Sequence, residues 1–302
     1  MSVKRVAACD LPNSEYHAPT FEGESYFSSS QLKKMLEAPE LFHEQYILGN
    51  AKPMKQSDAL VIGSYYHAGV LEPHLLGEEF AVYDGKVRRG SAWDKFQQDN
   101  QGKEILSQAN IAVADSLIQA TMNNERTMEL LAEGEPEVSF FGELEGVKVK
   151  IRFDFLNPSY GLDLKSTGKN AKSVYDIQSS MESFNYDLSA ALYMDLYNVW
   201  AAENNEPRMT EFYWPFASKS VGNCQVYKAT SDLIRVGRLK YKKALNLIKE
   251  HTAAGWVFED TIEELTPMRY VCDNWLTDSP KKEVQKHPEK QPPKKSELED
   301  LL

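Results

Sequence analysis

The sequence predicts a mixed α/β (α+β) fold in which a helical lead-in precedes a central mixed sheet flanked by helices. Two observations support this prediction. Up to residue 133, apolar residues recur mainly at helical spacing, whereas residues 147–156 alternate strictly between apolar and polar side chains. From there to residue 253, helical and strand patterns follow each other, as in a mixed domain.

Length and charge set bounds on the function. The 302 residues, 42% hydrophobic and 26% charged, can bury the core of one large domain or two small ones. The formal net charge of −11 argues against a protein that coats nucleic acid without specificity, because such proteins usually carry a basic excess. It does not exclude a nuclease, which needs carboxylates to hold cations. On charge alone, an acidic enzyme that never meets DNA is the simpler interpretation.

The cysteines and the N-terminus indicate the compartment. Cys9, Cys224 and Cys272 are far apart and form no CxxC or Cys/His spacing, so neither a disulfide framework nor a zinc or iron–sulfur site is expected. The N-terminus is a poor signal peptide, because its apolar stretch before Asp10 is short. No segment approaches the roughly 20 apolar residues that span a bilayer. We expect a cytoplasmic protein with no membrane partner.

The lead-in contains an expected arm and several expected helices. Residues 1–25 lack apolar periodicity and are expected to be an irregular arm. Serines suited to capping precede apolar residues at helical spacing in residues 28–36, and Pro39 ends or bends that helix. The further helices expected here span residues 39–49, 58–72 and 110–131.

The strand patterns begin near residue 137. Residues 137–144 lead through Glu145-Gly146, a hairpin signal, into residues 147–156, and residues 162–165 continue as a third strand after a turn at 157–161. Helices are then expected at 171–180, 186–204 and 231–253, and strands at 210–217 and 225–229. These elements define a single domain over residues 26–278, with lead-in 26–133 and catalytic core 134–278.

The segment 279–302 is rich in Lys, Pro and Glu, so it is expected to be disordered. It is interpreted either as a solvated tail or as a peptide that docks on a partner through Leu298, Leu301 and Leu302.

One group of residues in the core indicates chemistry. Alternation places Asp154 on the polar face of its strand, and it places Asp163 and Lys165 together on one face of the next strand. If the two strands pair as a hairpin, two carboxylates and an ammonium converge. Mg²⁺ takes oxygen ligands of this kind and activates a water, while a nearby lysine orients that water or stabilises the charged phosphorus centre. Alone, Asp-x-Lys is usually a surface strand with one salt bridge.

The context of this motif resembles the PD-(D/E)xK nuclease superfamily, and within it the RecE-type (exonuclease VIII) recombination exonucleases of phages and prophages. The preceding strand carries Asp154 among apolar residues, and a short turn, Gly-Leu-Asp163-Leu-Lys165 and a helix follow. The segment from Gly63 through His67 to Pro73 resembles the GxxxH…LEP helix of that family. Residues 28–39 resemble its opening helix, so the resemblance covers about residues 26–275. It implies a restriction-endonuclease-like core.

The resemblance also implies roles for residues. Asp154, Asp163, the backbone carbonyl of Leu164 and His67 would be metal ligands, and Lys165 would be the catalytic lysine. Mg²⁺ would be the cofactor, with Mn²⁺ able to substitute. Taken alone, His67 would more often be an ordinary helix histidine. Two interpretations of Glu137 stay open: it joins the metal site as a further ligand, or it is simply the first residue of a strand.

The sequence departs from the family at one helix. Related nucleases carry Tyr-x-x-Gln-x-x-x-Tyr after the lysine, and this chain has Tyr186, Ser189 and Tyr193 at those places. The three residues share a helix face, so they are supporting candidates, although serine reaches less far than glutamine. The alternative interpretation is that the two tyrosines are simply aromatic residues of the core. The candidate DNA-binding cations are Arg88, Arg89, Lys148, Lys150, Arg152 and Lys169.

These features predict a Mg²⁺-dependent exonuclease that hydrolyses phosphodiester bonds at duplex DNA ends. By resemblance it would act 5′ to 3′, leave a 3′ single strand for an annealing protein, and work as a ring-shaped homo-oligomer such as a trimer or tetramer. The resemblance also implies a bacterial or phage-infected cell. One alternative is a RecB-like or CRISPR-associated nuclease of other polarity, but those often hold an iron–sulfur cluster on four cysteines. The other is a DNA-binding protein that keeps the fold with weak catalysis.

Overall fold

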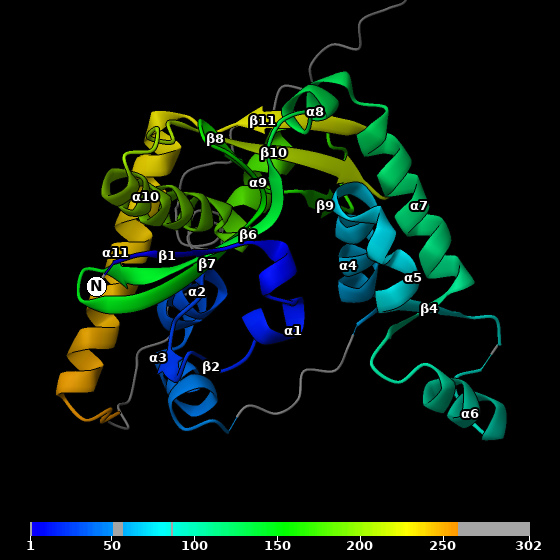
Figure 1. Ribbon diagram of the computed structural model, residues 1–302, viewed down its shortest axis with the longest axis horizontal. Helices are drawn as coiled ribbons and strands as arrows, with labels where there is room; N and C mark the ends of the chain where they lie inside the picture. The colour runs from blue at the N-terminus through cyan, green and yellow to red at the C-terminus, as the bar shows by residue number, and fades with distance from the viewer. Residues whose placement is uncertain (1, 51–56, 86, 259–302) are drawn as a thin grey trace, which may run out of the picture. The chain divides into compact units, whose positions relative to one another are not determined.

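The computed structural model describes residues 2–50, 57–85 and 87–258, which contain a seven-stranded mixed sheet with helices packed on it (Figure 1). The fold class predicted from the sequence is confirmed. Cys272 and the predicted tail 279–302 lie outside the described residues. In the described chain, no helix is long and apolar enough to cross a membrane.

The sheet is antiparallel at both ends and parallel at one place inside. Strand β10 pairs in parallel with β8 and β9, and the other neighbours pair antiparallel. The order across the sheet is β1 (Lys4–Val6), β6 (Glu135–Leu144), β7 (Val147–Asn157), β8 (Tyr160–Leu162), β10 (Glu211–Ser218) and β11 (Cys224–Lys228), with β9 (Lys165–Thr167) beside β10.

The hairpin of β6 and β7 forms where the sequence predicts it. Leu144 pairs with Val147, and the two turn residues, Glu145 and Gly146, have φ of 53° and 81°. Two successive positive φ values are typical of the two-residue turns whose twist matches that of a hairpin. Glycine adopts this backbone without a steric penalty, which explains its place at the second position.

The predicted third strand differs from the structure. The sequence indicates one strand over residues 162–165, but β8 ends at Leu162 and β9 begins at Lys165. The Leu164 N–H donates a 2.7 Å hydrogen bond to the Asp154 carboxylate instead of joining the strand ladder. A side-chain acceptor on the neighbouring strand therefore interrupts the sheet at this point.

The expectation of an irregular arm over residues 1–25 is wrong. This segment contributes β1 to the sheet edge, a short helix α1 (Asn13–Tyr16), and a small hairpin of β2 (Thr20–Phe21) and β3 (Glu24–Ser25). Its buried residues pack with Phe141 of β6 in a separate apolar cluster. They follow no helical or strand period, so only the tertiary contacts make this segment ordered.

The helices of the lead-in follow the sequence with local changes. Helix α2 (Ser29–Glu37) begins with a capping box between Ser28 and Gln31. Helix α3 (Pro39–Phe42) continues into a π-helical turn, and α4 (Asp58–Leu71) starts at the Ser57 cap. The predicted helix over residues 110–131 is two helices, α7 (Gln108–Met122) and α8 (Glu125–Leu130), because the Asn124 side chain caps a new start.

A small unit between α4 and α7 was not predicted. Strand β4 (Phe80–Tyr83) pairs in parallel with β5 (Glu104–Ser107), and α6 (Ser91–Asp99) lies between them in the chain. A 3-10 turn (Pro73–Leu75) and α5 (Leu76–Glu79) connect α4 to β4.

Three helices build the main core against the sheet. Helices α10 (Tyr186–Asn204) and α11 (Ser231–Ala253) pack on each other, α10 contacts β6 and β7, and α2 contacts both helices. A further helix, α9 (Val174–Phe184), precedes α10. A second apolar cluster forms where α4 and α7 pack around Phe155, Leu162 and Ala217. The N-terminal parts of α2 and α10 and the middle of α4 thus reach the strand ends around residues 154–165.

Candidate metal centre

The residues predicted to form the active centre lie together. Asp154 is near the end of β7, Asp163 and Leu164 occupy the break between β8 and β9, and Lys165 is the first residue of β9. His67 comes from α4, and its Nδ1 lies 3.3 Å from the Asp154 carboxylate.

Hydrogen bonds connect the members of this group. The two aspartates share a side-chain hydrogen bond, and the Lys165 ammonium donates to the Asp163 carboxylate. His67 also hydrogen-bonds to the backbone of Leu164. Because this bond favours the protonated ring, the ring donates and the Leu164 carbonyl accepts. The break in the third strand therefore presents that carbonyl to the candidate site.

The two aspartates have opposite electrostatic environments. Burial and the neighbouring Asp163 hold the pKa of Asp154 well above its usual range. Burial also opposes ionisation of Asp163, but the Lys165 ammonium and the hydrogen bond with Asp154 outweigh it and lower the pKa of that carboxyl. Compared with isolated carboxyl groups, the environment therefore favours the neutral form of Asp154 and the ionised form of Asp163. Because a metal ligand must be deprotonated, cation binding by Asp154 should depend on pH.

His67 is suited to be a metal ligand because it is neutral. Burial, reinforced by the Lys165 charge, lowers the pKa of its imidazole to about 4. At neutral pH its ring therefore carries no charge, and a lone pair is available to a cation.

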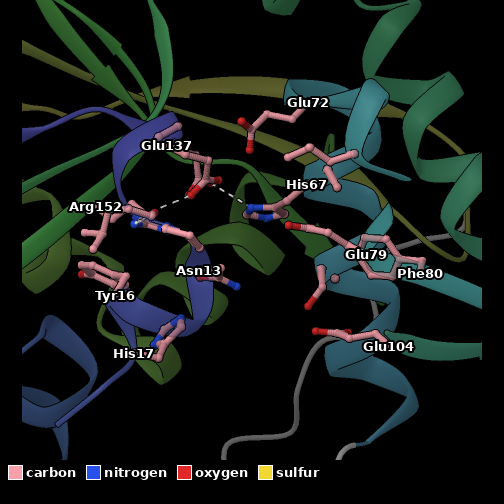
Figure 2. Close-up of a pocket in the computed structure, with 18 of the residues that line it drawn as sticks. Asn13, Tyr16, His17, His67, Glu72, Glu79, Phe80, Glu104, Glu137 and Arg152 are labelled. Atoms are coloured by element: carbon pink, nitrogen blue, oxygen red, sulfur yellow. Dashed lines mark hydrogen bonds and ion pairs between the residues drawn. The ribbon is translucent and has the colours of Figure 1, made fainter. Parts of the chain in front are cut away.

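Glu137 belongs to the same site. It lies on β6 opposite Asp154, between the pairs Pro136 with Phe155 and Val138 with Phe153, and its φ of 52° departs from the strand backbone. Positive φ is uncommon for a residue with a side chain and costs about 1–3 kcal/mol. Figure 2 shows its carboxylate directed toward the space that His67 and Arg152 also face. Burial raises the pKa of Glu137 to about 7.

The donor set fits a divalent cation. His67, Glu137 and Asp154 each offer one ligand atom, and the three atoms lie within 4.8 Å of one another. Asp163 is outside this triad but is hydrogen-bonded to Asp154, and the Leu164 carbonyl adjoins His67. Carboxylate and carbonyl oxygens suit a hard cation such as Mg²⁺ or Mn²⁺. The observation favours the interpretation of Glu137 as a ligand over that of a simple strand start.

The structure does not present Lys148, Lys150 and Arg152 as a phosphate-binding face. Lys150 and Arg152 are buried, and both donate to backbone carbonyls of the N-terminal segment, at 2.6 Å to Tyr16 and 2.8 Å to Leu11. Lys148 pairs with Glu24 at 2.6 Å. Strand alternation placed them correctly on one face, but it could not show that residues 1–25 cover that face.

The other predicted cations remain at the surface. Arg89 and Lys169 are exposed, and Lys169 donates to Ser179 at 3.1 Å. Arg88 is also exposed, lies over the Trp93 ring and is 3.8 Å from Asp58. The structure does not bring these three residues together with the candidate metal centre through any described contact.

The tyrosines of α10 lie beside the site. The Lys165 ammonium is 5.0 Å from the centre of the Tyr186 ring. Tyr193 lines the same cavity as Asp154 and packs against Phe153 at 5.3 Å between ring centres. Ser189 is buried on the same helix between them. Tyr186 therefore contacts the candidate catalytic lysine, while Tyr193 combines a core contact with a place in the cavity wall.

Sequence reasoning missed several residues around the site. The cavity, of about 770 Å³, also has Tyr16, Glu72 and Glu79 in its wall (Figure 2). The ammonium of Lys33, on α2, lies 5.5 Å from the centre of the Tyr186 ring, and the Lys165 charge acts on it. The spacing between His67 and Glu72 in the GxxxH…LEP segment could have indicated Glu72. Nothing in the sequence pattern distinguishes Lys33 from a solvated helix lysine.

Comparison with known proteins identifies a family and a similar fold. The family described as "PDDEXK-like domain of unknown function (DUF3799)" matches residues 28–255. Among solved structures, the crystal structure of a protein named "Putative exonuclease" from Eubacterium rectale is similar, with a TM-score of 0.57 and 20% sequence identity over 88% of this chain and 98% of that chain. At that identity the likeness shows a shared fold. No curated protein matches the chain.

Proposed function

Because the chain belongs to the PDDEXK-like family DUF3799, we propose that it is a metal-dependent deoxyribonuclease. The observation that supports this most directly is the convergence of Asp154, Asp163, His67 and Lys165 from separate elements on one centre. Sites with this donor set and an adjacent ammonium hydrolyse phosphodiesters in PD-(D/E)xK enzymes.

Each residue has a task in the proposed reaction. Asp154, Asp163, Glu137, His67 and the Leu164 carbonyl would hold the cation. When bound, the cation lowers the pKa of a water nucleophile and neutralises charge on the phosphate oxygens. Lys165 remains protonated, because Asp163 and Asp154 outweigh burial and raise its pKa. Its ammonium can therefore donate to the attacking water or to a phosphate oxygen.

The finer proposal concerns DNA ends. We infer an exonuclease that uses Mg²⁺, or Mn²⁺ in its place, to degrade one strand of linear duplex DNA 5′ to 3′ in recombination by strand annealing. The resemblance to RecE-type exonucleases supports this polarity, a ring-shaped homo-oligomer and an annealing partner. A nuclease of other polarity, RecB-like or CRISPR-associated, is the alternative that polarity measurements separate.

The test is digestion of linear duplex DNA labelled at either 5′ or 3′ end, with Mg²⁺ and with EDTA. We expect metal-dependent release of short products from the 5′ label. Asp163→Ala and Lys165→Ala should each lower the rate by at least about 100-fold, because each removes charge stabilisation made in the transition state. Asp232→Ala is the matched control, since Asp232 is an exposed aspartate on α11.

Two results would contradict the proposal. The nuclease assignment fails if the unmodified protein shows no metal-dependent digestion, or if both active-centre variants digest DNA at the full rate. Release from the 3′ label alone would keep the nuclease and refute the 5′ to 3′ direction. Binding without digestion would favour the DNA-binding alternative.

A further inference from the structure

The environment of Lys33 differs from that of a lysine on a solvent-exposed helix face. It is partly buried on α2, where Leu32 and Met35 on either side of it are in the core. Its ammonium lies 5.5 Å from the centre of the Tyr186 ring, and the Lys165 ammonium lies 5.0 Å from the same ring centre. The two lysines therefore approach one aromatic side chain from two different elements.

The carboxylates nearest to Lys33 are already paired. Asp163 and Asp187 both act on its charge, but Asp163 is bound by Lys165 and Asp187 pairs with Lys240 at 2.8 Å. Within the parts of the chain that the structure describes, Lys33 has no ion pair within 4.0 Å. Burial and the Lys165 charge accordingly lower the pKa of Lys33 to about 8.

An ammonium of this kind attracts an anion. Burying a charge without a partner is costly, and a second like charge nearby increases the cost. An anion bound to Lys33 would relieve both effects. The proposed substrate supplies such an anion at each nucleotide, because the phosphate held by the cation and Lys165 is followed along the strand by another phosphate.

We propose that Lys33 binds the DNA backbone phosphate next to the one being hydrolysed. This inference rests on the proposed nuclease function and adds a substrate contact to it. Lys33 holds the strand in register by binding one phosphate while Lys165 meets the phosphate that is hydrolysed, and both ammonium groups lie beside the Tyr186 ring. Lys33 is then a substrate-positioning residue, whose loss weakens binding more than it slows the chemical step.

The test compares Lys33→Gln and Lys33→Arg with Lys34→Gln. Lys34 is the matched control, because it is the next residue on α2 and pairs with Glu37 at the surface. Binding of a fluorescent duplex is measured by anisotropy with Ca²⁺ in place of Mg²⁺, over a range of KCl concentrations. The slope of log Kobs against log[salt] is negative, and the loss of one phosphate contact makes it less steep by about 0.9.

We expect Lys33→Gln to make this slope less steep by about 0.9, to raise the Kd about tenfold at a fixed salt concentration, and to raise KM in digestion more than it lowers kcat. Lys33→Arg and Lys34→Gln should keep the slope of the unmodified protein. Circular dichroism and thermal unfolding of each variant show whether it is folded. If Lys33→Gln misfolds, Lys33→Met takes its place, because it removes the charge and keeps an unbranched apolar stem; it should show the same loss of slope and affinity.

The outcomes separate this inference from the function on which it rests. An unchanged slope and unchanged KM in folded Lys33→Gln, with normal digestion by the unmodified protein, would overturn the role of Lys33 alone. A slope change of the same size in Lys34→Gln would overturn it as well. Absence of digestion by the unmodified protein refutes the nuclease, whatever the Lys33 variants show in binding.

Discussion

Replacing Glu137 by Gln should make the metal-free protein more stable at alkaline pH. The pKa of this carboxyl rises from 4.5 to about 7 in the folded state, mainly through burial. Folding therefore strengthens proton binding by Glu137, and ionisation of this carboxyl destabilises the folded state. The destabilisation is absent below pH 4.5, grows as the pH rises and is complete above pH 7. At about 1.4 kcal/mol per pH unit, the difference corresponds to about 3 kcal/mol. Glutamine, which does not ionise, avoids this penalty.

The assay is thermal unfolding at pH 5 and pH 8, with EDTA and with Mg²⁺. About 2–4 °C per kcal/mol is typical of a domain of this size, so Glu137→Gln should raise Tm at pH 8 in EDTA by about 6 °C or more, and far less at pH 5. Mg²⁺ should stabilise the unmodified protein more than the variant, because the cation offsets the charge of Glu137.

Glu78→Gln is the matched control, since Glu78 lines the same cavity and is exposed. Glu78→Gln should leave Tm unchanged at pH 5 and at pH 8. The reasoning is refuted if Glu137→Gln lowers Tm at pH 8 in EDTA, or if Mg²⁺ raises Tm equally in the variant and the unmodified protein.

Three further predictions concern single side chains. His67→Ala should weaken Mg²⁺ binding at least about tenfold, as calorimetric titration would show, because a neutral ligand is lost; equal affinity would exclude ligation. Tyr186→Ala should lower kcat about tenfold through loss of a cation–π contact with Lys165, while Tyr186→Phe, which keeps the ring, should retain activity. Equal effects of the two would assign the role to the hydroxyl. Gly237→Ala should cost about 1–3 kcal/mol in thermal unfolding, because its Cβ would lie 2.0 Å from the Asp187 carbonyl oxygen. Gly63→Ala, with open space around it, should not destabilise the fold.

Local sequence patterns determined most of the secondary structure and the central part of the site. The strict alternation of residues 147–156 indicated the strand that carries Asp154, and the bounds of α10 and α11 agree with the sequence prediction. Asp154, Asp163 and Lys165 could be grouped because a hairpin and a short turn separate them. His67 is distant in the sequence, and only its resemblance to a family motif connected it with them.

The tertiary structure decided what covers the strands and which charges are free. Residues 1–25 have no periodic pattern, so their fold depends on apolar contacts with β6 and on the carbonyls that bind Lys150 and Arg152. Those contacts convert an apparent DNA-binding face into a buried one. The left-handed backbone at Glu137 and the position of the Lys33 ammonium beside Tyr186 likewise arise from packing between distant segments. Local sequence specifies which groups lie on one element, whereas burial and pairing between elements set their charge and their access to a ligand.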